Sequence, residues 1–295
     1  LAPLDGCANS DLACTAALAA LKRAGVDKSQ IQLLLVATCT PDYPVPSTAT
    51  IVQEKLGLGE VAAIDIRSAC SGFAQALTVA SQFLKTGYYN TVMVIGSEVT
   101  STTGNLDLSA PGASVSDRVN ASMMGDGAAA FLMQSFSETD VTSGFARGHE
   151  LLYCKVNSIG VGQTPGLYMP AGGSLIPISQ EAIDQGLHFH KQDFRRVLSH
   201  GAELYVRGIN DALNALNKSI VDVDLIVPHQ ANGKLAHIGK GLGFDESKIF
   251  MNFERVGNTA NASLGLCIDE LAEQDSLPDG ALVLALAAES TKWLY

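Results

Sequence analysis

Charged residues are scarce in this sequence: Asp, Glu, Lys and Arg make up 17% of its 295 residues, whereas hydrophobic residues make up 47%. This balance is typical of an α/β protein whose sheets are covered by helices on both faces. Long apolar runs are also absent, and no charged-then-apolar leader opens the chain. We therefore expect a cytoplasmic protein without a membrane partner.

Basic clusters and cysteine pairs are missing too. With 19 Lys and Arg against 30 Asp and Glu, the net charge is −11, and no local run of basic residues offsets it. Binding to nucleic acid needs concentrated positive charge, so nucleic acid is not expected as a partner. The six cysteines form no CxxC pair and show no metal-ligand spacing. We expect reduced thiols, at most one of them reactive, and no metal site.

What the chain does contain is one order of helices and strands that occurs twice. Continuous apolar runs such as LLLVAT predict strands buried on both faces, and their alternation with helices predicts a parallel-rich α/β architecture. In the first half we expect helices over 10–24 (capped by Asn9 or Ser10 and stopped by Gly25), over 47–56 and up to Leu84, with strands over 33–38, 62–66, 91–95 and 128–133. In the second half we expect helices over 192–216, up to Lys240 and up to Leu271, with strands over 151–161, 224–227, 249–252 and 281–288.

The repeat predicts two halves, 1–145 and 146–295. The strand that opens the second half has no counterpart at the start of the first, and the strand that ends the first half has none at the end of the second. We expect from this that a complete gene product is longer at both ends. The Gly- and Pro-rich segment 162–190 interrupts the second half, and it is either a lid or pocket wall or a solvated surface loop.

Cys70 is the first candidate catalytic residue. It follows the buried strand 62–66 within the small-residue turn SACSG, at the first turn of a helix. Free backbone N–H groups and the positive end of the helix dipole favour a thiolate there, which predicts a lowered pKa for the thiol. Taken alone, a packed structural cysteine at a strand–helix junction explains the same position.

His229 and Asn258 stand at matching places in the second half. His229 follows the apolar run LIV, at the carboxyl end of a predicted parallel strand, where open α/β sheets bind ligands. Asn258 lies in the turn VGNTANAS after the next strand. Each is ordinary alone, because His is often structural and Asn is common in turns. Together with Cys70 they occupy equivalent strand–helix turns, which predicts one site shared by both halves.

These segments resemble a known family. IDIRSACSGFAQAL, VPHQANGKL and VGNTANASLG are similar, in order and spacing, to the three active-site segments of β-ketoacyl-[acyl-carrier-protein] synthase III enzymes, and GDGAAAFLM is similar to that family's GDGAGA turn. The resemblance covers the chain from its first helix to its end, except 162–190. It implies a thiolase-like α/β fold, with two duplicated βαβ halves in an α-β-α-β-α sandwich, and a homodimer.

The resemblance also implies an activity. Cys70 is expected to accept the acyl group of an acyl-CoA primer, while His229 and Asn258 donate hydrogen bonds to the thioester oxygen of a malonyl unit that loses carbon dioxide. A nucleophile splits the reaction into two easier steps, and neutral donors stabilise the enolate. The implied reaction is decarboxylative Claisen condensation with malonyl-acyl carrier protein or malonyl-CoA, in fatty-acid or related lipid or polyketide biosynthesis. Coenzyme A thioesters are substrates, and no cofactor is expected.

Two further residues are implied as binding residues. Arg118, in SDRVN, matches the family's arginine that stacks on the adenine of coenzyme A, although a solvated surface arginine is the alternative. Lys234 stands where the family has a basic residue that faces the acyl carrier protein, and a lysine meets such an acidic partner as a point charge.

The sequence departs from the family pattern in three places. The family's Trp/Arg segment that sandwiches coenzyme A has no match in the chain. Glu289 lies in AAEST, where relatives have a glycine-rich loop that supplies an oxyanion-hole amide, so its carboxylate stands near developing negative charge unless it turns away. Val45 replaces a large aromatic residue at the floor of the partner subunit's acyl pocket, which predicts room for a primer longer than acetyl.

Two alternatives remain open at this point. One keeps Cys70, His229 and Asn258 but uses them for non-decarboxylative condensation or for acyl transfer to a small nucleophile. The other is a catalytically silent subunit that shapes a partner's pocket. Retention of all three residues argues against the silent subunit, because such subunits usually lose the cysteine.

Overall fold

A four-stranded mixed sheet organises the first half of the molecule. The computed structural model describes residues 6–105, 114–136, 149–231, 245–274 and 276–295. The strand order is β2-β1-β3-β4, with β1 parallel to both of its neighbours and β4 antiparallel to β3. The strands are β1 (Leu33–Ala37), β2 (Ala62–Ile66), β3 (Thr91–Glu98) and β4 (Gly127–Gln134).

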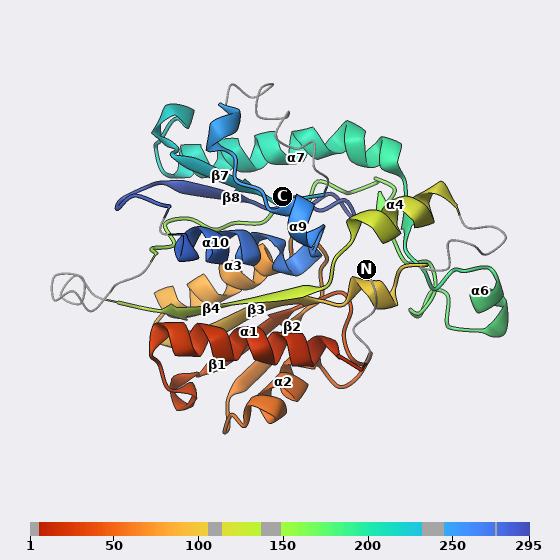
Figure 1. Cartoon of the computed structure of the whole chain (residues 1–295), viewed down its shortest axis with the longest axis horizontal. Coiled ribbons are helices and arrows are strands. Elements are labelled where there is room, and N and C mark those ends of the chain that lie inside the picture. The colour runs from red at the N-terminus through yellow and green to blue at the C-terminus, as the bar shows by residue number, and fades with distance from the viewer. Residues whose placement is uncertain (1–5, 106–113, 137–148, 232–244, 275) are drawn as a thin grey trace.

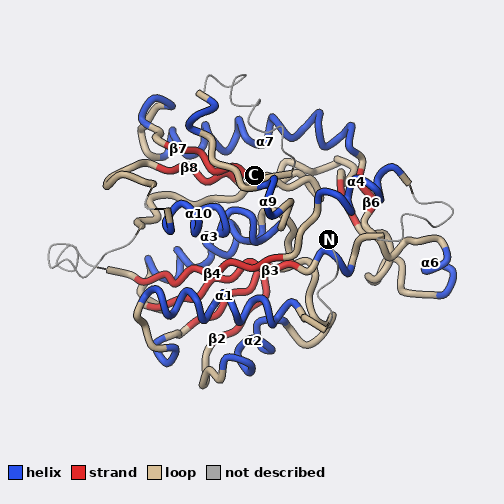
Figure 2. Tube along the Cα trace, viewed as in Figure 1, coloured by secondary structure: helices blue, strands red, loops and turns tan. Residues whose placement is uncertain are grey.

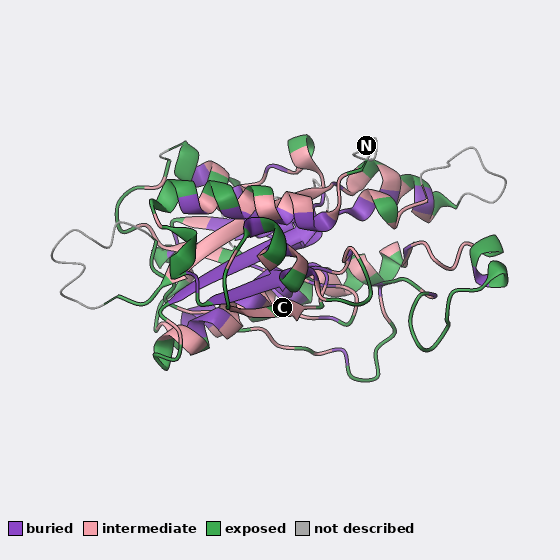
Figure 3. Cartoon of the chain, turned by 90° about the horizontal axis from the view of Figure 1, so that it is seen from below, coloured by how far each residue is buried: buried purple, intermediate pink, exposed green. Residues whose placement is uncertain are grey.

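Helices cover both faces of this sheet because its central strands are apolar on both sides. Side chains alternate along a strand, so Leu33 and Leu35 of β1 pack against one layer of helices while Leu34 and Val36 pack against the other. The outer layer consists of α1 (Asn9–Ala24) and α2 (Thr48–Leu56), and α3 (Gly72–Lys85) lies on the inner face. Figure 3 shows the strands buried beneath partly exposed helices.

The second half adds a smaller sheet and closes the sandwich. The parallel strands β7 (Leu225–Pro228) and β8 (Val283–Leu286) lie between α7 (Phe194–Ala215) on the outside and α10 (Ser263–Glu273) on the inside. Cys267 and Leu271 of α10 join Phe73 and Ala76 of α3 in one core cluster. Helices and strands therefore alternate in five layers, α-β-α-β-α, as Figures 1 and 2 show, and the predicted fold class is confirmed.

Smaller elements gather beyond the carboxyl ends of the main strands. In Figure 1, α4 and α6 lie past the end of β3, on the side of the molecule where the N-terminus is marked. Among the described residues, no helix is both long and apolar enough to cross a bilayer. The remaining elements are α4 (Val115–Met123), α6 (Gln180–Asp184), α9 (Phe253–Val256), the antiparallel pair β5 (Leu167–Tyr168) and β6 (Lys191–Gln192), and the 3-10 helices η1 (Lys28–Gln30), η2 (Thr100–Thr102), η3 (Ile220–Asp222), η4 (Glu246–Lys248) and η5 (Ala260–Ala262).

Two predicted strands of the second half are wrong. Segment 151–161 forms only an isolated bridge, between Ser158 and Leu294, because only residues 157–159 meet a partner segment, residues 293–295. Segment 249–252 likewise forms only a parallel bridge from Ile249 to Ile226, since η4 ends immediately before it and α9 begins immediately after it. The predicted helix up to Lys240 lies outside the described residues.

The predicted ends of the first two helices are confirmed at their C-termini, but the predicted N-cap of α1 is wrong. Gly25 ends α1 with φ of 64°, and Gly57 ends α2 with φ of 60°, as their lack of a Cβ allows. The predicted cap at Asn9 or Ser10 is wrong, because the helix already begins at Asn9 and Ala8 is the N-cap. Asp11 compensates by accepting a hydrogen bond from the Ala8 amide at 2.9 Å. The boundary between 145 and 146 falls within undescribed residues and stays a prediction.

Candidate active site

Cys70 lies in the turn between β2 and α3, with 7% of its surface exposed. It packs with Ala69 and Ala260, and Cys39 lies against this small cluster. The first residue of α3 is Gly72, so Cys70 stands two residues before the helix and not within its first turn as predicted. The nucleophile candidate therefore contacts the second half of the chain through Ala260.

The turn that carries Cys70 is clamped by Asn261, which belongs to η5 in the other half. The Asn261 Nδ2 atom donates to the carbonyl of Ser68 at 2.8 Å, and its Oδ1 atom accepts from the Phe73 amide at 2.9 Å. A Cβ on Gly72 would collide with the same Asn261 oxygen. Glycine is therefore required where the helix begins, because the side chain of Asn261 fills the space.

Glu289 makes a second connection between the halves. It follows β8, is 2% exposed, and turns toward the Cys70 turn instead of away from it. Its Oε2 atom accepts from the Ser71 amide at 3.0 Å, the Ser71 hydroxyl at 2.5 Å and the Ser68 hydroxyl at 2.8 Å. Its own amide donates to Leu294 at 2.9 Å. The Glu289 amide is therefore unavailable to stabilise an oxyanion.

The prediction of a lowered pKa for Cys70 is wrong for this arrangement. Burial raises the pKa of the Cys70 thiol far above its ordinary value, and the nearby carboxylates of Glu289 and Glu98 raise it further. The amide of Ser71 at the start of the helix donates to Glu289, so it is unavailable to the sulfur. The thiol is therefore protonated at neutral pH, and helix-end activation alone cannot produce the nucleophile.

His229 lies directly after β7 and is 1% exposed. Its amide donates to Leu286 at 2.7 Å, and its carbonyl accepts from the Tyr205 hydroxyl at 2.6 Å. Neither ring nitrogen has a hydrogen-bond partner in the described part of the chain. Burial lowers the pKa of the His229 imidazole to about 4, with the Glu289 charge acting in the opposite direction. At neutral pH the ring is uncharged and has one donor and one acceptor to offer.

Asn258 is held by the GDG turn of the first half. Its amide donates to Met123 at 2.7 Å, and its carbonyl accepts from Gly125 at 2.9 Å. A Cβ on Gly125 would collide with the carbonyl of Val256, so the two turns can approach only with glycine there. The Asn258 Oδ1 atom accepts from the Ala260 amide at 3.0 Å, which leaves the Nδ2 atom as the donor toward a ligand.

Cys70, His229 and Asn258 are linked through shared neighbours from both halves. The Glu289 charge acts on both Cys70 and His229, and Ala260, which packs on Cys70, is hydrogen-bonded to the Asn258 side chain. Such a group can bind a thioester carbonyl between neutral donors and attack it with sulfur. The individual roles of these residues stay predictions.

Arg118, one of the two binding residues implied by the resemblance, is not part of this group among the described residues. Arg118 is exposed on α4, and no contact of its side chain brings it to Cys70 or His229 within the described residues. Lys234 lies outside the described residues. Val45 is 84% exposed on the single chain. No group of three or more His, Cys, Asp or Glu residues in the described ranges is placed to hold a metal.

Glu98, the last residue of β3, was missed by the sequence analysis. It is fully buried and accepts hydrogen bonds from the Cys39 amide at 3.0 Å and from the side chains of Thr40 and Asn261. Burial raises the pKa of its carboxyl group, while these hydrogen bonds oppose the shift. The sequence feature that could have identified Glu98 is a carboxylate at the carboxyl end of an otherwise mostly apolar strand.

Two family models and many known proteins match this chain. The family model described as 3-oxoacyl-[acyl-carrier-protein (ACP)] synthase III matches residues 64–146, and the model of the C-terminal part of these enzymes matches residues 213–290. The β-ketoacyl-[acyl-carrier-protein] synthase III of Symbiobacterium thermophilum is 34% identical over 281 residues, which cover 95% of this chain and 79% of that protein.

Solved structures show the same fold. The 3-oxoacyl-[acyl-carrier-protein] synthase III of Aquifex aeolicus matches with a TM-score of 0.81 and 26% identity, covering 98% of this chain and 83% of that one. A tetronic acid condensing enzyme matches with a TM-score of 0.80 and 25% identity, covering 97% of this chain and 80% of that one. The chain therefore belongs to the β-ketoacyl-[acyl-carrier-protein] synthase III family of condensing enzymes.

Proposed function

We propose that this protein catalyses decarboxylative condensation of an acyl-CoA primer with malonyl-acyl carrier protein or malonyl-CoA, with the primer held as a thioester on Cys70. The observation that carries the proposal is the buried, neutral His229, whose two ring nitrogens have no partner among the described residues. A polar ring buried without partners is costly, and a bound thioester oxygen removes that cost.

The first half-reaction acylates Cys70. The sulfur attacks the carbonyl carbon of the primer thioester, the carbon–sulfur bond to coenzyme A breaks, and the thiol proton of Cys70 passes to the departing sulfur. Because burial holds that proton on Cys70, a neutral base must carry it, and His229 is uncharged at neutral pH. The product is acyl-Cys70 and free coenzyme A.

The second half-reaction extends the chain. The malonyl thioester loses carbon dioxide, and the resulting enolate oxygen accepts hydrogen bonds from His229 and from the Nδ2 atom of Asn258. Preorganised neutral donors stabilise that charge without first binding a proton. The enolate carbon then attacks the acyl carbonyl, and the carbon–sulfur bond to Cys70 breaks. The β-ketoacyl thioester leaves, and the Cys70 thiolate takes a proton from water.

The wider assembly forms part of the same proposal. Arg118 binds the nucleotide end of coenzyme A, and Lys234 meets the acyl carrier protein. The protein works as a homodimer in the cytoplasm, with the exposed Val45 entering the partner's acyl pocket and leaving room for primers longer than acetyl. Sedimentation equilibrium tests whether the protein is a dimer, and cell fractionation tests its location. Acylation rates with acetyl-CoA and octanoyl-CoA test the role of Val45, which a strong preference for acetyl-CoA would reject.

Intact-protein mass measurement tests the central claim. After incubation with acyl-CoA, the wild-type protein gains one acyl mass, and Cys70→Ala gains none. No added mass on the wild type, or equal added mass on Cys70→Ala, defeats the proposal and returns the protein to the class of silent subunits. Cys154→Ala, which replaces a half-buried thiol of the same chain, is the matched control and acylates like the wild type.

Glu289 favours a second candidate function. Its buried carboxylate acts on Cys70 and His229, and it would repel the carboxylate of a malonyl unit. Non-decarboxylative condensation of two acyl thioesters has no such anion in its substrate. Release of labelled carbon dioxide from malonyl-CoA, in step with product formation, separates the two: release supports the first function, and product without release supports the second.

A further inference from the structure

Two buried carboxylates are connected to the turn that carries Cys70. Glu289 accepts hydrogen bonds from both the amide and the hydroxyl of Ser71, the residue that follows Cys70. Glu98 accepts from the Nδ2 atom of Asn261, which also donates to the backbone of the Cys70 turn. Both carboxylates act electrostatically on the Cys70 sulfur, and they therefore also act on an acyl group attached to it.

The hydrogen bonds around Glu289 favour its ionised form. The Nε2 atom of Gln75 donates to the hydroxyl oxygens of Ser68 at 2.7 Å and Ser71 at 2.9 Å. The hydrogens of both hydroxyls therefore point away from Gln75 and are donated to the Oε2 atom of Glu289. The Thr291 hydroxyl donates to Oε1, so both oxygens accept and neither has room for a proton.

Glu98 is surrounded in a similar way. The hydroxyl oxygen of Thr40 accepts from the Val99 amide at 2.9 Å, and that of Thr38 accepts from the Thr40 amide at 3.0 Å. The hydrogens of these hydroxyls are then donated to the Oε2 atom of Glu98, while the Cys39 amide donates to its Oε1 atom at 3.0 Å. These bonds oppose the effect of burial and favour the charged carboxylate.

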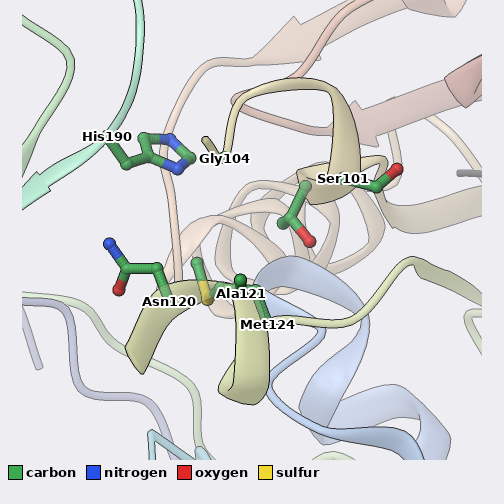
Figure 4. Close-up of a pocket in the computed structure, with 7 residues that line it drawn as sticks. Ser101, Gly104, Asn120, Ala121, Met124 and His190 are labelled. Carbon is green, nitrogen blue, oxygen red and sulfur yellow. The ribbon is translucent and has the colours of Figure 1, made fainter. Parts of the chain in front are cut away.

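No cation offsets these charges in the described part of the chain. Neither carboxylate forms an ion pair there, and His229 is uncharged at neutral pH. Arg67, in the segment before Cys70, is exposed to solvent. Figure 4 shows a small cavity beyond β3, and its lining residues include neither Lys nor Arg. An anion that approaches Cys70 therefore meets like charge without a counter-charge from these residues.

We propose that Glu289, assisted by Glu98, restricts acylation of Cys70 to acyl groups that carry no carboxylate. The inference rests on the proposed function and names its primer class, the uncharged acyl-CoA. It concerns the loading step, in which the acyl carbon passes from the coenzyme A sulfur to Cys70 and the thiol proton passes the other way. Decarboxylative and non-decarboxylative condensation share that step. Like charges repel strongly where water is excluded, and this repulsion also keeps a malonyl unit off the nucleophile.

A matched pair of primers tests the inference on the whole chain. Succinyl-CoA and succinamoyl-CoA have the same length and shape but differ in charge. Their rates of Cys70 acylation are measured by intact mass, and the mass gained by Cys70→Ala is subtracted. We expect succinyl-CoA to load about tenfold more slowly, as for like charges about 10 Å apart at an effective dielectric constant of about 20. Adipyl-CoA should lose less against adipamoyl-CoA, because its carboxylate lies farther from the thioester.

Variants then assign the penalty to the two carboxylates. Glu289→Gln should raise the ratio of succinyl to succinamoyl rates about tenfold, whereas Glu289→Asp keeps the charge and should leave the ratio low. Glu98→Gln provides a second test and should raise the ratio by a smaller factor, because Glu98 acts more weakly on Cys70. Glu273→Gln, at an exposed ion pair, is the control. Because the ratio compares two primers on one protein, partial misfolding of a variant does not alter it.

The outcomes separate this inference from the function on which it rests. A wild-type ratio near one, an equal penalty for succinyl- and adipyl-CoA, or a ratio that Glu289→Gln leaves unchanged overturns the selection by charge. So does an equal rise in Glu289→Gln and Glu289→Asp, because it would show that the contacts of Glu289 matter and its charge does not. The condensing function survives all of these results, whereas failure of octanoyl-CoA and of every other primer to load defeats it.

Discussion

The two halves contribute opposite kinds of surface to the site. The Cys70 turn of the first half is saturated with hydrogen bonds, from Asn261 and from Glu289. His229, from the second half, has a fixed backbone but a ring without any partner in the described residues. The turn that carries Cys70 is therefore held in place before substrate arrives, whereas the ring nitrogens of His229 remain available to form hydrogen bonds with the substrate.

The largest effect is expected from removing the open imidazole. His229→Ala should lower the rate of condensation on the order of 10²- to 10³-fold, because the enolate loses a preorganised donor. Acyl loading without malonyl substrate should fall as well, because His229 also carries the thiol proton of Cys70 in that step. Rapid-quench measurement of both half-reactions checks this. An unchanged loading rate would contradict the role of His229 as the base.

Breaking the clamp on the nucleophile should act on stability as well as on activity. Asn261→Leu removes the bonds to Ser68 and Phe73 and leaves the buried Glu98 with one partner fewer. We expect the free energy of unfolding to fall by about 3 kcal/mol, as for other buried polar groups left unpaired. Urea denaturation measures it, and Asn214→Leu on the surface is the control. An unchanged midpoint would contradict the clamp.

The neutral state of His229 predicts a pH dependence of stability. The folded pKa of about 4 lies below the ordinary 6.5, so between these values the unfolded chain binds a proton that the folded chain does not. The sign is therefore destabilising: on lowering the pH from 7 to about 4.5, this residue should cost about 2–3 kcal/mol. The free energy of unfolding is measured for the wild type and for His229→Gln at both pH values. The difference between the two proteins isolates the contribution of His229, because the other titrating groups contribute equally to both. If the stability of the two proteins depended on pH in the same way, the His229 ring would be charged or exposed in the folded protein.

The smallest effect expected concerns Glu289. Because its charge raises the pKa of the Cys70 thiol, Glu289→Gln should move the pH profile of iodoacetamide alkylation at Cys70 toward lower pH and make labelling several-fold faster at pH 8. A merely structural role would slow catalysis without that acid shift. Glu273→Gln, which removes an exposed carboxylate at the end of α10, serves as the control.

Most of the secondary structure follows from local pattern. The apolar run at Ala62–Ile66 is the strand that the sequence predicts, and Gly25 and Gly57 end their helices with positive φ angles. Local rules failed where pairing depended on distant residues. Segment 151–161 has a strand-like composition, but only residues 157–159 find a pairing partner, at residues 293–295.

By itself the sequence determined the layered fold and the family, because apolar periodicity and small-residue turns depend on residues close together in the chain. The meeting of Cys70, His229 and Asn258 in one site stays a prediction. Only the tertiary structure decided the protonation of the site. The pKa values of Cys70 and His229 are displaced chiefly by burial, and burial exists only once two halves far apart in sequence have packed together. The same packing turned Glu289 toward Ser71, because electrostatics and desolvation depend on neighbours in space.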